Sequence, residues 1–144
     1  MTTYREFFRQ FSLLYRPFEH HLNLQLAKHG LYRAQWTIIY YLSNQSSATL
    51  VELSNYQNVE KPTVTRTINR LEELGIVEQM PSKDKREKRI QLTLLGKQVY
   101  EEVRLTVDKY EQHILKGISE SDQLNSIRLM EEIRKNILTK GEHE

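Results

Sequence analysis

Residues 62–93 read PTVTRTINRLEELGIVEQMPSKDKREKRIQLT, a stretch in which a helical pattern gives way to a strand-like pattern. In the first half, apolar side chains recur every three or four residues, as they do along the buried face of a helix. These side chains are Val64, Ile68, Leu71 and Leu74. Gly75 follows the last of them and predicts the end of the helix, because glycine readily takes the left-handed conformation that closes a helix.

The second half of the stretch predicts a β-hairpin with a strongly basic tip. Residues 76–80, IVEQM, and residues 89–93, RIQLT, alternate apolar and polar side chains, which is typical of strands. From residue 83 to residue 89 there are five basic and two acidic side chains, a net charge of +3. The basic residues are Lys83, Lys85, Arg86, Lys88 and Arg89, and the acidic ones are Asp84 and Glu87. A solvated hairpin needs few polar residues, so this excess of cations indicates a polyanionic partner.

Upstream of this stretch the chain is predicted to form three helices. A long first helix is expected over 1–30 and a second over 33–44, because apolar residues repeat there at helical spacing. The second helix is expected to bury Trp36, Ile39, Tyr40 and Leu42. Thr49 and Glu52 have the spacing of a capping box and predict the start of a short third helix.

Downstream, two more helices are predicted. Thr93 is expected to cap a long helix over 94–116, and the segment 119–122, SESD, to cap a last helix that ends near Leu138. The expected order is α-α-α-α-β-β-α-α. The predicted fold is therefore mainly α with a small two-stranded β wing.

Length and composition point to one soluble domain, 1–144. The chain has no cysteine, which excludes disulfides and thiolate metal sites. Its first residues lack the apolar core of a signal peptide. The longest apolar run, IIYYL at 38–42, is far too short to span a bilayer, so we expect a cytoplasmic protein without a membrane partner.

Neither catalysis nor a cofactor is indicated. The sequence contains no nucleophile elbow and no glycine-rich phosphate loop, so we expect no enzyme activity. Five histidines suggest a metal site, but no two of them are three or four residues apart, the spacing that presents two ligands on one helix face. We therefore expect no metal, and a metal-responsive regulator is retained only as an alternative.

Two short helices followed by a hairpin form a winged helix-turn-helix, which the sequence places at 33–93. The helix over 62–74 would pack its apolar face inward and turn a small, polar and basic face outward. That outer face comprises Pro62, Thr63, Thr65, Arg66, Asn69 and Arg70. Such a face fits a major groove, where Arg66 can reach guanine and the helix N–H groups can bind phosphate. The alternative is an ordinary surface helix whose charges serve solubility.

The segments PTVTRTINRLEELGIVEQMPSKDKREKRIQLTLLG and GLYRAQWTIIYYL closely resemble the MarR family of bacterial transcriptional regulators. The resemblance covers the whole length of the chain, with the flanking helices matching in pattern. It implies that the wing contacts DNA through Lys83, Asp84, Lys85, Arg86 and Lys88. In this reading Arg86 enters a minor groove, and Asp84 holds the wing by pairing with a basic neighbour. The alternative for Asp84 is a turn residue that bonds its own backbone.

The family resemblance also implies a dimer. The helices at 1–30 and 94–139 carry more apolar surface than a small domain can cover, and in the family such helices interlock into a homodimer. A two-fold dimer would present two recognition helices to the half-sites of a pseudo-palindromic DNA operator. The alternative is an intramolecular helix bundle.

The resulting hypothesis is a dimeric, sequence-specific DNA-binding regulator, a repressor that a small molecule releases. Many family members bind phenolic effectors between the dimer helices and the DNA-binding lobe. An aromatic effector would here meet Tyr15, Tyr40, Tyr41 and Tyr100, whose alternative role is that of ordinary core aromatics. The rival hypothesis is a winged-helix protein-interaction module that binds no specific DNA.

Overall fold

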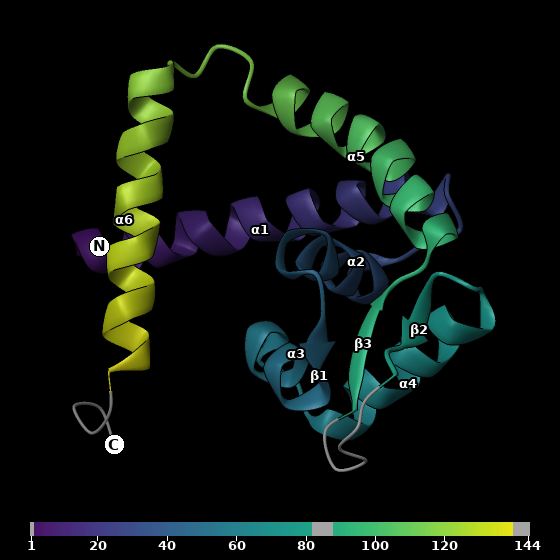
Figure 1. Ribbon diagram of the computed structural model, residues 1–144. Helices are drawn as coiled ribbons and strands as arrows, with labels where there is room; N and C mark the ends of the chain where they lie inside the picture. The colour runs from purple at the N-terminus through teal and green to yellow at the C-terminus, as the bar shows by residue number, and fades with distance from the viewer. Residues whose placement is uncertain (1, 82–87, 140–144) are drawn as a thin grey trace. The chain divides into compact units, whose positions relative to one another are not determined.

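The computed structural model describes residues 2–81 and 88–139 and contains six helices and three strands in that part of the chain (Figure 1). The helices are α1 Thr3–Ala27, α2 Arg33–Gln45, α3 Leu50–Gln57, α4 Lys61–Glu73, α5 Leu94–Ile114 and α6 Glu120–Leu138. The strands are β1 Ala48–Thr49, β2 Val77–Gln79 and β3 Arg89–Leu92. The predicted fold class and the order of the predicted elements are confirmed, with one strand added.

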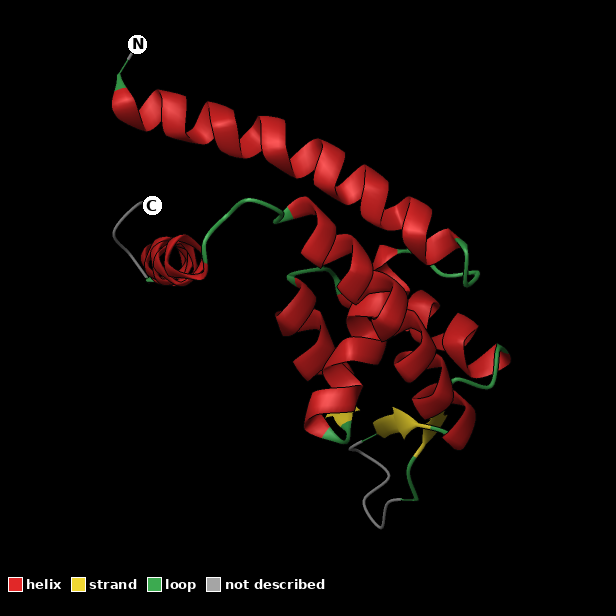
Figure 2. Cartoon of the chain, turned by 90° about the horizontal axis from the view of Figure 1, so that it is seen from above, coloured by secondary structure: helices red, strands yellow, loops and turns green. Residues whose placement is uncertain are grey.

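The sheet has three antiparallel strands in the order β1-β3-β2, one strand more than the predicted two-stranded wing. Figure 2 shows the strands in yellow. β2 and β3 form the predicted hairpin, with Val77 opposite Leu92. β1 pairs with the other edge of β3, placing Thr49 opposite Arg89. A strand of two residues is too short to show an alternating pattern, and for this reason the sequence does not reveal it.

The helices from α1 to α5 and the sheet share one apolar core. Its largest fully buried side chains are Leu22, Leu26, Ile38, Ile39, Leu42, Leu53, Val64, Leu71, Val103 and Val107. Two side chains that were expected to be buried are partly exposed: Tyr40 is 36% exposed and Leu74 is 37% exposed. Tyr40 lies one turn beyond Trp36 and stands 6.2 Å from it, ring centroid to ring centroid, at the edge of the core.

The predicted helix ends are built from the expected residues. Thr49 and Ser119 cap α3 and α6, each accepting a hydrogen bond from the backbone N–H three residues later. Gly75 has a φ of +77° after α4, and the Ile76 N–H donates to the Leu71 carbonyl at 2.9 Å. This bond and the left-handed glycine close the helix and turn the chain into β2.

Two compact units make up the chain, residues 1–110 and residues 111–144. The second unit contains the end of α5 and all of α6, and no residue of α6 is buried. Several of its large apolar side chains are exposed: Leu124, Ile127, Leu129, Met130, Ile137 and Leu138. In the first unit, the N-terminal half of α1 exposes Phe7, Phe8, Phe11 and Leu14 in the same way.

Where the wing meets α5, the chain passes very close to itself. The Thr93 N–H and hydroxyl both lie within hydrogen-bonding distance of the Ile76 carbonyl, at 3.0 and 3.2 Å, and the hydroxyl also bonds the Gly75 carbonyl. Thr93 caps α5 by accepting from the Gly96 N–H at 3.0 Å. A Cβ at position 96 would overlap the Ile76 carbonyl oxygen, which belongs to the backbone and has little room to move.

Gly96→Ala is therefore expected to destabilise the protein by about 1–3 kcal/mol, the usual range for overpacking. At an unconstrained helix position the same change would stabilise by about 0.5–1 kcal/mol, so the sign of the effect is informative. Urea unfolding of the two proteins measures it. Gln98→Ala, at an exposed position of the same helix, is the control and should stay within about 0.5 kcal/mol of wild type. A stabilised Gly96→Ala protein would contradict this close approach.

Candidate nucleic-acid interface

The turn between α3 and α4 is fixed by local hydrogen bonds. Asn58 takes the left-handed conformation, with a φ of 54°, which asparagine tolerates better than most residues. The Val59 N–H donates to the Ser54 carbonyl at 3.1 Å, and the Ser54 hydroxyl donates back to the Val59 carbonyl. These bonds join α3 and α4 as a helix-turn-helix.

The outward face of α4 includes all six residues predicted from the sequence. Pro62, Thr63, Thr65, Arg66, Asn69 and Arg70 are all exposed. The opposite face is buried and comprises Val64, Thr67, Ile68 and Leu71. Arg66 Nη2 donates to Thr63 Oγ1 at 3.3 Å, which holds the guanidinium along the helix surface, whereas Arg70 forms an ion pair of 3.0 Å with Glu73.

The N-terminus of α4 has fewer N–H groups for an anion than the sequence suggested. Pro62 has no N–H, and the amides of Thr63 and Val64 both donate to the Glu60 carbonyl, at 3.1 and 3.2 Å. Phosphate would instead meet the exposed side chains of this first turn. One of these, Lys61, is a basic residue that the sequence analysis did not select, although its place beside Pro62 at the helix start was visible.

The structure describes only part of the wing. Lys83, Asp84, Lys85 and Arg86 lie outside the described residues, so their predicted roles stay predictions. Lys88 is described and is exposed, as a DNA contact requires. On the hairpin itself, the Met80 N–H donates to the Arg89 carbonyl at 2.9 Å, which extends the pairing of the two strands toward the tip.

Arg89 has a different role from the one expected. By its place in the sequence it belongs with the cations expected to face DNA, but its guanidinium turns toward the start of the helix-turn-helix. Nε donates to Ser47 Oγ at 3.0 Å, and Nη1 donates to Glu52 Oε1 at 3.2 Å. Nη2 lies 3.5 Å from the Ser47 carbonyl oxygen. Arg89 therefore links the wing to the N-terminal end of α3.

Glu52 is the acceptor on which this corner depends. The predicted capping box is present in one half only: Thr49 accepts from the Glu52 N–H at 3.1 Å. The Glu52 carboxylate instead accepts from Arg89 and from the hydroxyl groups of Thr49 and Tyr41. Burial raises the pKa of Tyr41, and the negative charge of Glu52 raises this pKa further.

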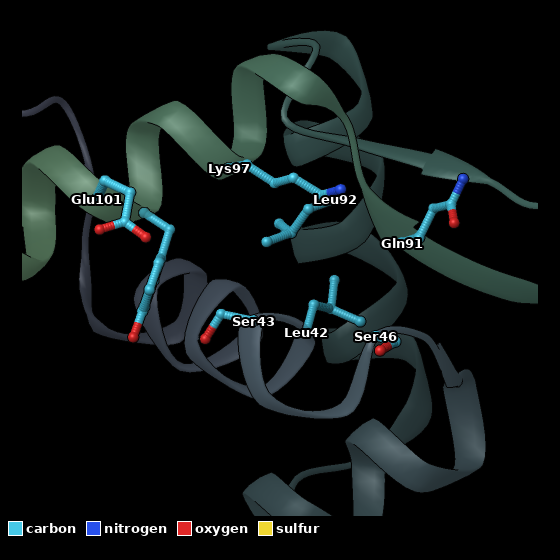
Figure 3. Close-up of a pocket in the computed structure, with 8 residues that line it drawn as sticks. Leu42, Ser43, Ser46, Gln91, Leu92, Lys97 and Glu101 are labelled. Atoms are coloured by element: carbon cyan, nitrogen blue, oxygen red, sulfur yellow. The ribbon is translucent and has the colours of Figure 1, made fainter.

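A cavity of about 400 Å³ lies among α2, β3 and α5 (Figure 3). It is lined by Leu42, Ser43, Ser46, Gln91, Leu92, Lys97, Tyr100 and Glu101. In Figure 3, Leu42 and Leu92 project into the space between α2 and the strand, with Lys97 and Glu101 on α5. The lining residues thus combine apolar side chains with three hydroxyl groups, one amide, one cation and one anion.

The four tyrosines predicted to meet an effector are not brought together in this cavity. Tyr100 lines it and stacks on Trp36 at 5.7 Å between ring centroids. Tyr40 also packs against Trp36, in a tilted arrangement. Tyr41 bonds Glu52 and packs against Tyr56, and Tyr15 stacks on Phe11 on the exposed part of α1. None of these last three lines the cavity.

No group of three or more potential ligands in residues 2–81 and 88–139 could hold a metal ion. Among these residues there is also no helix long and apolar enough to cross a membrane.

The raised pKa of Tyr41 has a measurable consequence. A phenol whose folded-state pKa lies above its unfolded value of about 10 stabilises the fold below that pH. This contribution is lost as the pH rises through the folded-state pKa. Absorbance titration should therefore show a tyrosine that ionises late, and Tyr41→Phe should remove this step while Tyr15→Phe keeps it. Identical titration curves for wild type and Tyr41→Phe would contradict the environment described here.

Comparison with known proteins agrees with this architecture. The profile of the MarR family matches residues 31–88. An uncharacterised HTH-type transcriptional regulator of Staphylococcus aureus (strain MSSA476) is 35% identical over 142 residues, covering 96% of this chain and 97% of the relative.

Solved structures give the same result. The structure of Staphylococcus aureus MarR in complex with salicylate and kanamycin matches with a TM-score of 0.85 and 33% identity, covering 95% of this chain and 93% of that one. NadR in complex with 4-hydroxyphenylacetate matches with a TM-score of 0.75 and 25% identity, over 86% of this chain and 89% of that one. The chain therefore belongs to the MarR family of winged helix-turn-helix transcriptional regulators.

Proposed function

We propose that the protein is a homodimeric repressor that reads a pseudo-palindromic DNA operator through α4 and the wing, and that a small aromatic effector releases it. The observation that carries this proposal is the outward face of α4, where every contact residue predicted on this helix is exposed. Lys88 of the wing is exposed as well. An α-helix of this kind fits the major groove of B-DNA.

Within that face, Arg66 is the residue proposed to read a base. Its guanidinium is exposed and bonds only the hydroxyl of Thr63 among the contacts described, so it can turn to the two acceptors of a guanine at little cost. Thr63 and Thr65 are small enough to let the helix approach and can contact phosphate or a thymine methyl group. Lys61 and Lys88 supply positive charge on either side without reading the sequence.

Dimerisation is proposed through helices α1, α5 and α6. Single exposed apolar residues are common on soluble proteins, but α6 exposes six large ones and buries none. The N-terminal half of α1 adds three phenylalanines, two of which pack in a T-shaped, edge-to-face arrangement. Burying such surfaces against a second copy of the chain would pair two recognition helices for two half-sites.

An effector with a carboxylate and a phenolic hydroxyl suits the cavity among α2, β3 and α5. Lys97 can pair with the carboxylate, and Glu101 can accept a hydrogen bond from the phenolic hydroxyl. Leu42, Leu92 and Tyr100 can enclose the ring. Salicylate and 4-hydroxyphenylacetate, bound in the two solved structures named above, both combine these groups. Tyr15, Tyr40 and Tyr41 remain candidates for an effector contact only if the dimer brings them to it.

The cavity also offers a route from effector to DNA. Two of its lining residues, Gln91 and Leu92, belong to β3, the strand that leads out of the wing. A ligand that fits this space better in one arrangement of β3 and α5 would shift the population toward that arrangement. The effector would thereby lower DNA affinity without touching DNA.

The DNA proposal is tested with a duplex that the wild-type protein selects from random-sequence DNA. Arg66→Ala should reduce discrimination at one base pair by about 1–3 kcal/mol. Lys88→Ala should weaken all duplexes alike and make the dependence on salt shallower. Titrations by fluorescence anisotropy at several salt concentrations measure both effects.

The wild-type protein itself should lose about 10³- to 10⁵-fold in affinity between 50 and 200 mM salt, if the dimer contacts roughly 6–10 phosphates. Affinity that hardly changes with salt would favour the rival hypothesis, a winged helix that docks proteins. An equal and uniform loss in both variants would remove Arg66 from base reading and leave the rest of the proposal intact.

Salicylate serves as the probe for the effector site. It should weaken binding of the wild-type protein to the selected duplex, and Lys97→Met should raise the salicylate concentration needed by roughly tenfold, the effect of losing one charge-assisted hydrogen bond. Lys109→Met removes an exposed lysine from the same helix away from the cavity and should behave like wild type. If both variants respond like wild type, salicylate acts elsewhere.

A further inference from the structure

We propose that Arg89 and Glu52 form a clamp that sets the position of the wing relative to the helix-turn-helix, so that Arg89 is a positioning residue for DNA binding and does not contact DNA. This inference rests on the proposed function, because it concerns how the wing serves the DNA contact. It gives Arg89 a role opposite to that of Lys88, its neighbour in sequence and in charge.

The contacts of Arg89 join parts of the chain that are far apart in sequence. Ser47 lies 42 positions and Glu52 lies 37 positions before it. Nε and Nη1 each donate to a different partner, and Nη2 points to the Ser47 carbonyl. A guanidinium holds its donors in one rigid plane, so bonds to two separate segments restrict its direction strongly. A lysine ammonium would not impose the same geometry.

The backbone is fixed at the same place. Arg89 pairs with Thr49 across β1 and β3, and its carbonyl accepts from the Met80 N–H across the hairpin. Arg89 is therefore held by its side chain and on both sides by its backbone. Lys88 directly precedes it, so the point from which the basic tip leaves the sheet is set by these contacts.

The other end of the clamp belongs to the part that positions α4. Glu52 lies in the first turn of α3, whose Leu53 is fully buried and which packs against α4 in the helix-turn-helix. Glu52 is held in turn by the hydroxyl groups of Thr49 and Tyr41. A displacement of the wing would therefore have to break bonds to the same helix pair that presents Arg66 to DNA.

The turn that carries Ser47 is itself in an unusual conformation. Ser46 has a φ of 68° and a ψ of −46°, and the Ser47 N–H donates to the Gln45 carbonyl at 2.7 Å, which makes a γ-turn of the rare, strained kind. A non-glycine residue keeps such a conformation only where its surroundings determine it. Here the turn presents both the hydroxyl and the carbonyl of Ser47 to Arg89.

The partial exposure of the Arg89–Glu52 pair means that it can position the wing without contributing much to the stability of the fold. The side chains of Arg89 and Glu52 are 32% and 40% exposed, and an ion pair with that much water around it contributes little to the free energy of folding. Its main effect is to restrict where the wing lies, so breaking it should alter DNA binding far more than the unfolding transition.

The experiment measures binding of the full-length protein to a duplex that the wild type selects from random-sequence DNA. Arg89→Gln and Glu52→Gln should each weaken binding by about 3- to 30-fold, because each dimer contains two clamps whose individual effect is that of an exposed ion pair. The double variant, Arg89→Gln with Glu52→Gln, should bind the duplex no more weakly than the single variant with the lower affinity. Restoring opposite charges in exchanged places, Arg89→Glu with Glu52→Arg, should recover part of the loss.

The sign of the Glu52→Gln effect is decisive. Removing a negative charge near DNA should strengthen binding to a polyanion, and should do so especially if it frees Arg89 to reach a phosphate. A clamp predicts the opposite, a loss. Stronger or unchanged binding by Glu52→Gln, together with weaker binding and a shallower salt dependence for Arg89→Gln, would make Arg89 a phosphate contact and overturn the proposal.

A double-mutant cycle with Lys88 tests positioning directly. If the clamp aims Lys88, then Lys88→Ala should weaken binding clearly in the wild type and much less in the Arg89→Gln background. Equal losses in the two backgrounds would overturn the positioning role, even if Arg89 supports the fold. Thermal unfolding of each variant shows whether the fold persists at the temperature of the titrations.

Arg9 and Glu6 provide the matched control. They form an exposed pair on α1 with the same 3.2 Å separation as the clamp, on the side of the helix away from Phe7 and Phe11. Arg9→Gln and Glu6→Gln change the net charge as the clamp variants do and should change binding little.

If the wild type itself binds no selected duplex, the proposed function and this inference both fail. If it binds and all clamp variants bind equally well, only the clamp fails.

Discussion

The backbone of Ile76 is the point on which the arrangement of the first unit depends. Its N–H closes α4 by donating to the Leu71 carbonyl, and its carbonyl accepts from Thr93 at the end of β3. Gly96 at the start of α5 lies against the same carbonyl, where any side chain would overlap it. The two peptide groups that flank the Ile76 Cα thus fix α4, the hairpin and α5 against one another. The outward face of α4 and the direction of the wing both follow from this junction.

Much of this architecture is visible in the sequence, because local physical rules produce it. The spacing of Val64, Ile68 and Leu71 reflects the burial of one face of α4, so it also identifies the face that stays exposed. Gly75 and Thr93 mark helix ends through backbone conformation and capping, which involve only near neighbours. These rules gave the helix order, the hairpin and six of the eight exposed positions of α4.

What the sequence could not give depends on partners that are distant along the chain. β1 is recognisable only through its pairing with β3, and Arg89 can be separated from Lys88 only once Ser47 and Glu52 are seen beside it. The exposed position of Tyr40 has a similar origin, since helical periodicity places it near Trp36 without showing where the core ends. The residues that line the cavity come from α2, β3 and α5, and no local pattern unites them.

The arginines near the proposed DNA-binding surface differ in whether they form ion pairs. From the sequence, Arg66, Arg70 and Arg89 are equivalent cations, yet Arg70 and Arg89 form ion pairs with Glu73 and Glu52. Among the described residues, Arg66 forms no ion pair and touches only a hydroxyl group. A paired arginine must give up its carboxylate before it can bind DNA, whereas Arg66 gives up one neutral hydrogen bond.

The cavity and the wing are connected through residues that are adjacent in the chain. Ser46 lines the cavity while Ser47 holds Arg89, and Gln91 lines it from the strand that Arg89 begins. The cavity and the clamp therefore share the turn after α2 and the strand β3. Because Ser46 and Ser47 are adjacent residues of one strained turn, a shift of this turn would reach both the cavity and the clamp. In the proposed function, specificity at α4 and control through the wing would therefore arise from different residues. A regulator of this design could change its response while it keeps its operator.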